Sequence, residues 1–177
     1  MDENKNMEFT NAVVVIKEAI VRARYQAAAL VNRELLGLYY AVGKYVSDNS
    51  RRGYWGQGAV KRISVDLQKE LPGLRGFSES SIRLMRLFHE EWQSVLSNHQ
   101  LTTDEMQISE KNENIIDLNL LFRHTENYVA DGFSADEFLR VGFTHHSEIL
   151  AKEKSLEGRL FYISRCAAEF WSVNTRQ

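Results

Sequence analysis

Nine side chains in the first half of the chain have the chemistry to bind a nucleic acid. They are cationic or carry a hydroxyl group, and they are Arg51, Arg52, Lys61, Arg62, Arg75, Ser80, Ser81, Arg83 and Arg86. Cationic groups bind phosphates, and arginine and serine can also hydrogen-bond base edges. Residues 51–86 carry a net charge of +5, against zero for residues 1–50 and −7 for residues 87–177. Charge alone favours two interpretations equally. The segment could bind phosphates, or it could be a solvated surface that meets acidic residues of this chain or of a second subunit.

The sequence carries no local signature of catalysis or of metal binding. It has no P-loop, no G-x-S-x-G, no H-E-x-x-H and no G-x-G-x-x-G. His145 and His146 are adjacent, and neighbours on a helix point about 100° apart, so they cannot both face one ligand. We expect one packed and one exposed histidine. The single cysteine, Cys166, lies in a helical apolar pattern, which favours a buried structural thiol. The sequence therefore predicts a protein without enzymatic activity, metal or cofactor.

Two amphipathic helices would position the basic side chains. The first has apolar residues three and four apart and stops at Pro72 and Gly73, where a proline ends the helix and glycines allow a reversal: Val60, Ile63, Leu67 and Leu71. The second begins after Ser78, which can cap its first turn, and continues the apolar face of Ile82, Met85, Phe88, Trp92 and Leu96. Two such helices joined by a glycine-bearing turn are typical of a helix-turn-helix. The turn has about six residues and is longer than the usual three or four. A groove that binds a protein would also tolerate this longer turn.

A long helix is predicted ahead of this pair, from about Asn11 to about Val46. Its pattern has almost no breaker, and a kink or a break would fall near Gly37 or Gly43. At a rise of 1.5 Å per residue it would be roughly 50 Å long, so it must pack against several later helices or pair with another copy. Residues 47–58 read as a loop by their Ser, Asn, Asp and Gly content, with Trp55 as a buried anchor.

The rest of the chain predicts further short helices. Residues 98–113 are polar and acidic, which indicates a flexible linker or an insertion. The pattern of residues 115–130 fits a short hairpin or a helix. Ser134 and Glu137 form a capping-box signature, and further helices are predicted from Thr144 and after Ser155. A last helix would open within residues 171–177.

The predicted fold class is therefore all-α. Residues 1–97 would hold the long helix and the helix-turn-helix-like pair, residues 98–113 the linker, and residues 114–177 a C-terminal helical part of the same domain. No apolar run approaches 18 residues, and the polar N-terminus lacks a signal-peptide pattern. We expect a cytoplasmic protein without a membrane segment.

The central stretch WGQGAVKRISVDLQKELPGLRGFSESSIRLMRLFHEEW, residues 55–92, resembles the hallmark of the YhcG-type N-terminal domain. This is a bacterial domain of unknown function with a helix-turn-helix-like region. The resemblance extends back over AIVRARYQAAALVNRELLGLYYAVGKYV and forward to FTHHSEILAKEKSLEGRLFYISRCAAEFWSV. It covers most of the chain outside the linker.

The resemblance implies a DNA-related role. In that family the domain commonly precedes a nuclease domain of the PD-(D/E)xK type, and the N-terminal part is expected to bind DNA or partner proteins. The resemblance does not imply catalysis here, since the chain ends where the helix leading to the nuclease would start. We expect either a stand-alone copy or a fragment without its nuclease.

Non-catalytic DNA binding is the function that the sequence favours. Arg83 and Arg86, with Ser80 and Ser81, would approach a groove, while the phosphates would be contacted by Lys61, Arg62, Arg75 and Arg51 or Arg52. For any one arginine, the alternative is an ordinary solvent-exposed helix charge. The alternative function is a protein-interaction or oligomerisation module, in which the long helix and the acidic second half form a homo-oligomer or dock a nuclease partner.

Overall fold

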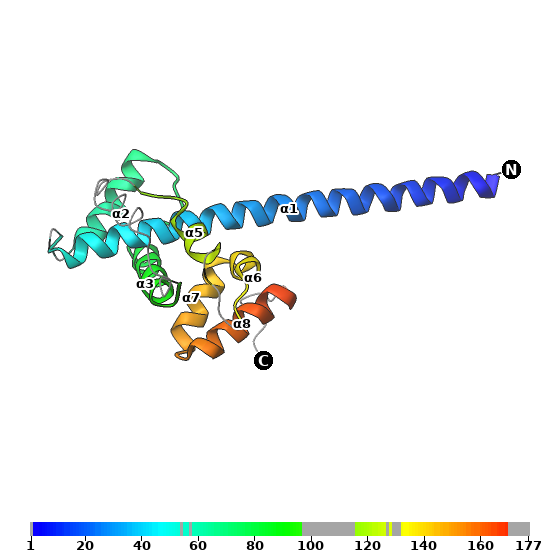
Figure 1. Cartoon of the computed structure of the whole chain (residues 1–177). Helices are drawn as coiled ribbons and strands as arrows, with labels where there is room; N and C mark the ends of the chain where they lie inside the picture. The colour runs from blue at the N-terminus through cyan, green and yellow to red at the C-terminus, as the bar shows by residue number, and fades with distance from the viewer. Residues whose placement is uncertain are drawn as a thin grey trace.

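The computed structural model of this chain describes residues 2–53, 55–56, 58–96, 116–126, 128 and 132–169, and over these ranges it contains helices and no strand (Figure 1). The all-α fold class is confirmed. The helices are α1 (Asp2–Arg51), α2 (Ala59–Glu70), α3 (Glu79–Leu96), α5 (Leu120–Glu126), α6 (Ala135–Arg140), α7 (Phe143–Lys152) and α8 (Leu156–Glu169). The linker predicted at residues 98–113 and the helix predicted within residues 171–177 lie outside the described residues.

Helix α1 is a long rod, and the other helices gather around its C-terminal half (Figure 1). The predicted long helix is confirmed, and it begins and ends beyond the predicted bounds. It runs through Gly37 and Gly43 without a break. The loop predicted from residue 47 is wrong for residues 47–51, which complete α1. Ser47 is buried and donates a hydrogen bond to Glu90 at 2.6 Å, and this tertiary contact outweighs its local preference for a turn.

Both glycines of α1 lie where another part of the chain comes close. A Cβ atom on Gly43 would overlap the Met85 carbonyl oxygen and lie 2.9 Å from His89 Cβ. A Cβ atom on Gly37 would lie 2.9 Å from the Leu118 carbonyl oxygen. Glycine at these positions therefore lets α1 contact α3 and the segment before α5 at backbone distance, and this requirement explains two residues that weaken the helix on their own.

The core lies where α3 crosses α1 and continues into α5 to α8. The predicted inner face of α3 is buried in full, with Met85, Phe88 and Trp92 at 0% exposure. Around it pack side chains of α1, α5, α6, α7 and α8, among them Leu36, Tyr40, Leu121, Phe138, Ile149, Leu150, Leu160 and Ile163. Trp92 meets the Phe138 ring edge to face at 4.8 Å between centroids. This single cluster joins the first half of the described chain to the second.

The connection between α2 and α3 is the predicted turn. Gly73 and Gly76 adopt φ values of 86° and 84°, a region that favours glycine. Ser78 caps α3, because its Oγ accepts a hydrogen bond from the Ser81 amide at 3.2 Å. Helix α2 packs more loosely than predicted: Leu71 is 54% exposed, and the buried residue of α2 is Ser64, which donates to the Phe77 carbonyl at 2.8 Å.

The second half of the described chain follows the predicted order of helices. Of the two structures left open for residues 115–130, the helix is present as α5. Ser134 caps α6 by accepting the Glu137 amide at 3.3 Å, as its capping-box signature predicts. The helix predicted from Thr144 begins one residue earlier, and the helix predicted after Ser155 begins at Leu156. No helix in the described ranges combines the length and the apolar content that crossing a membrane requires.

Two histidines are buried in the core. His146 donates its Nε2 proton to the Phe138 carbonyl at 3.0 Å, and burial lowers the pKa of His146 to about 3. Burial, helped by the ammonium of Lys44, lowers the pKa of His89 to about 4. His146 is thus the packed member of the predicted pair, while His145 is half-buried rather than exposed.

Replacing Gly43 by alanine should destabilise the protein. Alanine favours a helix over glycine by about 1 kcal/mol, but the overlap with Met85 should outweigh that gain and leave a net loss of about 1–3 kcal/mol. Chemical denaturation of Gly43→Ala measures this loss. Gly56→Ala is the matched control, because a Cβ atom on Gly56 meets nothing within 4 Å. Equal stability of the two variants would contradict the close crossing.

The buried histidines should make the protein sensitive to acid. Their pKa values are lowered in the folded state, so the unfolded chain binds more protons below pH 6.5 and stability falls from there toward pH 4. Each histidine steepens this dependence by up to about 1.4 kcal/mol per pH unit. His89→Phe should flatten the curve and keep the stack on Tyr40, whose ring lies 4.8 Å from that of His89. An unchanged slope of unfolding free energy against pH would contradict this assignment.

Candidate nucleic-acid interface

The predicted binding residues come from four consecutive parts of the chain at one end of the molecule. Arg51 is the last residue of α1 and Arg52 follows it; Lys61 and Arg62 lie on α2, Arg75 lies in the turn, and Ser80, Ser81, Arg83 and Arg86 lie in the first half of α3. Figure 1 shows α2 and α3 at the C-terminal end of α1, away from the tip of the rod. The cationic residues therefore belong to the part of the molecule that α1 and α3 fix together.

The N-terminus of α3 carries a cluster of serine hydroxyls. Ser78 Oγ lies 2.9 Å from Ser80 Oγ and 2.8 Å from Ser81 Oγ, so the three side chains share hydrogen bonds. Ser80 is exposed and Ser81 is half-buried beneath it. Because the amides of a first helical turn attract negative charge, an exposed hydroxyl at this end can donate to a phosphate.

Arg83 and Arg62 each form an ion pair with a carboxylate one turn away on the same helix. Arg83 donates to Glu79 at 2.7 Å, and Arg62 lies 3.6 Å from Asp66. The hydrogen bond from Lys69, with the nearby Arg62, lowers the pKa of the Asp66 carboxyl. The side chains of Arg62 and Arg83 are 87% and 61% exposed. Exposed pairs of this kind contribute about 0.2–1 kcal/mol and are screened by salt, so a phosphate can replace the carboxylate at little cost.

Arg51 and Arg86 are brought together by a third carboxylate. Glu90 lies 2.9 Å from Arg86 Nε and 3.4 Å from Arg51 Nη2, and it also accepts the hydrogen bond from Ser47. Partial burial on its own would raise the pKa of Glu90, but the Ser47 hydrogen bond and the two guanidinium groups hold that pKa below its usual range. Arg86 is half-buried in this cluster, whereas its spacing on α3 predicted an outward position.

Ser47 and Glu90 are the site residues that the sequence analysis missed. The only signal for Glu90 is its position four residues after Arg86, a spacing that also occurs in ordinary surface pairs. No pattern in the sequence links it to Ser47 or Arg51, which precede it by about 40 residues. The crossing of α1 and α3 creates this cluster.

Lys61 and Arg75 are exposed, and neither forms an ion pair within the ranges that the structure describes. Their ammonium and guanidinium groups are directly available to an anion. With the exposed Arg52 they complete the cationic set, which no acidic cluster in residues 51–86 offsets.

The sequence matches the family described as DUF1016 N-terminal domain over residues 15–177. This match covers almost the entire chain. The chain belongs to this family. The resemblance to the YhcG-type N-terminal domain is thereby confirmed. No curated protein and no solved structure matches the chain.

The candidate interface of this DUF1016 N-terminal domain also exposes apolar side chains. On α3, Leu84 is 40% and Leu87 is 36% exposed, and both follow Arg83 closely in the chain. On α2, Val65 is 46% exposed. These residues were not predicted as part of the site, since each lies outside the main apolar stripe of its helix. An apolar and cationic mixture suits a macromolecular partner better than a small anion.

No group of three or more histidine, cysteine, aspartate or glutamate side chains in the described ranges could hold a metal ion. Among these residues, the titratable groups with the largest pKa shifts are packed in the core and do not lie among the exposed cations.

Glu90→Gln should cost the DUF1016 N-terminal domain about 1–2 kcal/mol at pH 7, because it removes a charged acceptor shared by three donors. The pKa of Glu90 is lowered in the folded state, so its contribution is complete above the ordinary glutamate pKa of 4.5 and is lost as pH falls through the folded value. The gap in unfolding free energy between wild type and variant should therefore close in acid. Glu79→Gln, which alters an exposed pair, should change stability by less than about 0.5 kcal/mol. Equal effects of the two substitutions at pH 7 would contradict the role of Glu90.

Proposed function

We propose that this DUF1016 N-terminal domain is a non-catalytic DNA-binding domain. The observation that supports the proposal is the set of exposed cations on one end of the molecule: Arg52, Lys61, Arg62, Arg75 and Arg83. These cations outnumber the carboxylates between residues 51 and 86, which are Asp66, Glu70 and Glu79. Positive side chains in excess over a small area attract a phosphate backbone even when the whole chain is slightly acidic.

The first turn of α3 is the part that approaches a groove in this proposal. Ser80 and Arg83 are exposed there and can reach base edges or flanking phosphates. Arg86 and Arg51 support this part of the surface, because Glu90 holds both guanidinium groups close to the end of α1. Arg52, Lys61, Arg62 and Arg75 contact phosphates and set the register of the domain on the duplex.

The biological setting follows from the resemblance to the YhcG-type domain. Domains of that type commonly precede a PD-(D/E)xK nuclease, so the DNA-binding surface would deliver DNA to a nuclease domain on the same chain or on a partner. We propose a cytoplasmic location in a bacterial cell on the same ground.

Binding to a fluorescent DNA duplex over a series of salt concentrations tests the proposal. The logarithm of the binding constant should fall linearly with the logarithm of salt concentration, with a slope of about 0.9 per phosphate contact. The double variant Lys61→Gln and Arg75→Gln should weaken binding. Its salt slope should be smaller by the amount that roughly two phosphate contacts contribute. Arg83→Gln with Arg86→Gln should weaken binding further, by about tenfold or more.

Arg140→Gln with Lys152→Gln is the matched control. These cations lie on α6 and α7, and each forms an exposed pair with a carboxylate four residues earlier, as Arg83 does on α3. The control removes the same charge and should leave affinity unchanged apart from a small effect of net charge. Equal losses in the control and in the α3 variant would show non-specific attraction, and no binding at low salt would overturn the proposal.

A protein-interaction module is the second candidate function, and a different part of the molecule favours it. The N-terminal half of α1 projects from the other helices and exposes many large apolar side chains (Figure 1). Monomeric proteins rarely leave a continuous apolar surface of this extent uncovered. The two functions use different surfaces, so they can coexist in one protein.

A further inference from the structure

The projecting part of α1 has an apolar surface that no described residue covers. From residue 11 to residue 28 every side chain is exposed, and among them Val13 is 65%, Ile16 58% and Ile20 47% exposed. Leu30, two residues further on, is 62% exposed. An isolated helix in water derives little stability from propensity alone, and burial of an apolar face normally supplies the rest. This segment therefore requires a partner surface.

The apolar residues follow the spacing of a coiled coil. Steps of three and four alternate through one continuous seam, Val13, Ile16, Ile20, Ala23, Ala27 and Leu30. This is the a and d pattern of the heptad repeat, which places every member on one side of the helix facing a second helix. The remaining large apolar residues, such as Val15 and Val21, lie outside the seam.

We propose that a second copy of this chain covers the seam, with the two helices antiparallel. The proposal deepens the second candidate function and does not depend on DNA binding. In an antiparallel pair centred between residues 21 and 22, the numbers of two seam residues that face each other add up to 43. Ile20 then faces Ala23 of the other copy, Ile16 faces Ala27, and Val13 faces Leu30. Every isoleucine of the seam thus meets an alanine.

This complementarity points to self-association in particular. A two-fold interface requires that if residue i contacts residue j of the partner, residue j also contacts residue i. The four central seam residues, Ile16, Ile20, Ala23 and Ala27, match large to small when their order is reversed, so they meet this condition without help from another sequence. Filling small positions with large ones from the facing helix is also how helix interfaces reach close packing.

The available area is sufficient for a dimer. Residues 11–30 span about 28 Å, and covering half the circumference of a helix about 11 Å wide would bury roughly 500 Å² on each chain. The total of about 1,000 Å² reaches the size that a specific interface requires. In the antiparallel arrangement the helices that surround the C-terminal half of each α1 lie at opposite ends of the coil.

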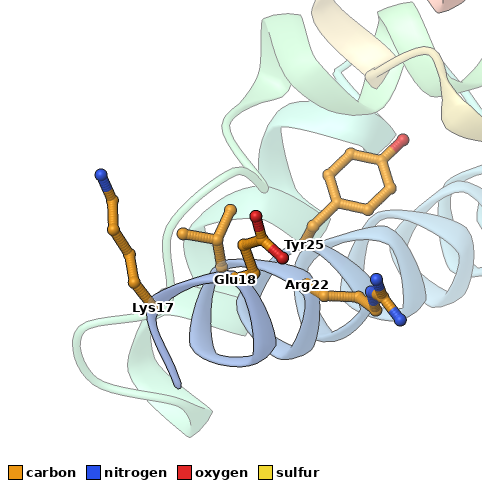
Figure 2. Close-up of a pocket in the computed structure, with 5 residues that line it drawn as sticks. Lys17, Glu18, Arg22 and Tyr25 are labelled. Carbon is orange, nitrogen blue, oxygen red and sulfur yellow. The ribbon is translucent and has the colours of Figure 1, made fainter. Parts of the chain in front are cut away.

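Charged residues beside the seam distinguish an antiparallel pair of helices from a parallel pair. Lys17 and Arg24 occupy the e positions, which face each other in an antiparallel coil, so Lys17 of one copy lies beside Arg24 of the other. Their long stems can cover the seam while the charges reach solvent. Figure 2 shows Lys17, Glu18, Arg22 and Tyr25 around a hollow whose walls all come from α1. Glu18 and Arg22, of opposite charge and four residues apart, form the solvent-facing side of the coil.

Sedimentation of the whole chain over a range of concentrations tests the proposal. The 20.5 kDa chain should sediment as a dimer at high concentration. Ile20→Asp should weaken dimerisation about a hundredfold, because it buries a carboxylate at the centre of the seam. Val15→Asp is the matched control: Val15 is 64% exposed on the same helix but lies outside the seam, and the dimer should persist. Circular dichroism should show the same fold in both variants.

A charge reversal tests the antiparallel direction. Arg24→Glu places a glutamate beside Lys17 of the other copy twice in each dimer, and it should lower the dissociation constant about tenfold. Adding Lys17→Glu to that variant restores like charges and should cancel the gain. In a parallel coil residue 24 faces Ala19, and neither change would alter the affinity in this way.

Three outcomes would overturn the proposal. These are a monomer at every concentration, equal effects of Ile20→Asp and Val15→Asp, and no gain from Arg24→Glu. A monomer would indicate that a different protein covers the seam. Each of these results is independent of the DNA titration, because the seam lies in the N-terminal half of α1, the cationic surface lies on α2, α3 and the end of α1, and the two share no residue.

Discussion

The structure depends on one close approach, between the backbone of α1 at Gly43 and the backbone of α3 at Met85. Two helices can meet at this distance only where one lacks a side chain, so a single glycine determines where α3 crosses the rod. The crossing places Tyr40 against Phe88 and His89 and presents the apolar face of α3 to α5 through α8. Burial of that face then joins the two halves of the described chain. Gly37 serves the same purpose toward the segment before α5.

The same crossing separates two kinds of arginine. Arg51 and Arg86 converge on Glu90, and because Ser47 also donates to Glu90 this cluster links the end of α1 to the middle of α3. Arg62 and Arg83 form exposed pairs within their own helices, where water and salt compete with the carboxylate. The first kind orders the scaffold, and the second kind remains available for a polyanion. A basic surface carried on a rigid support in this way binds with less loss of conformational entropy than a flexible one.

Helix α1 has two parts with different environments. Its C-terminal half is enclosed by the other helices, while its N-terminal half projects from them without cover (Figure 1). If the projecting halves pair in an antiparallel coil, two cationic surfaces are held at opposite ends of one rod. Two linked DNA-binding surfaces increase overall affinity through effective concentration and restrict binding to sites whose spacing they can span. The rod would then set the spacing of the two cationic surfaces as well as the oligomeric state.

Periodicity and turn chemistry in the sequence were sufficient to predict most of the helices, but they left residues 115–130 open between a hairpin and the helix α5. The 3.6-residue pattern, the Pro72 and Gly73 stop, and the serine caps at residues 78 and 134 are local signals, and local hydrogen bonding obeys them in the structure. The buried face of α3 was predictable for the same reason, since its spacing alone separates inside from outside. The family was recognisable from residues 55–92 before any contact was known.

The tertiary structure decided what each helix meets. Gly37 and Gly43 read as weak points of a helix, and only the partner backbones show that they are contact points. Residues 47–51 read as a loop, because Ser, Asn and Asp favour turns, and a partly buried hydrogen bond from Ser47 to Glu90 draws them into α1. The cationic residues could be named from the sequence, but the convergence of Arg51 and Arg86 on Glu90 could not. That convergence depends on contacts between residues far apart in the chain, which no local pattern records.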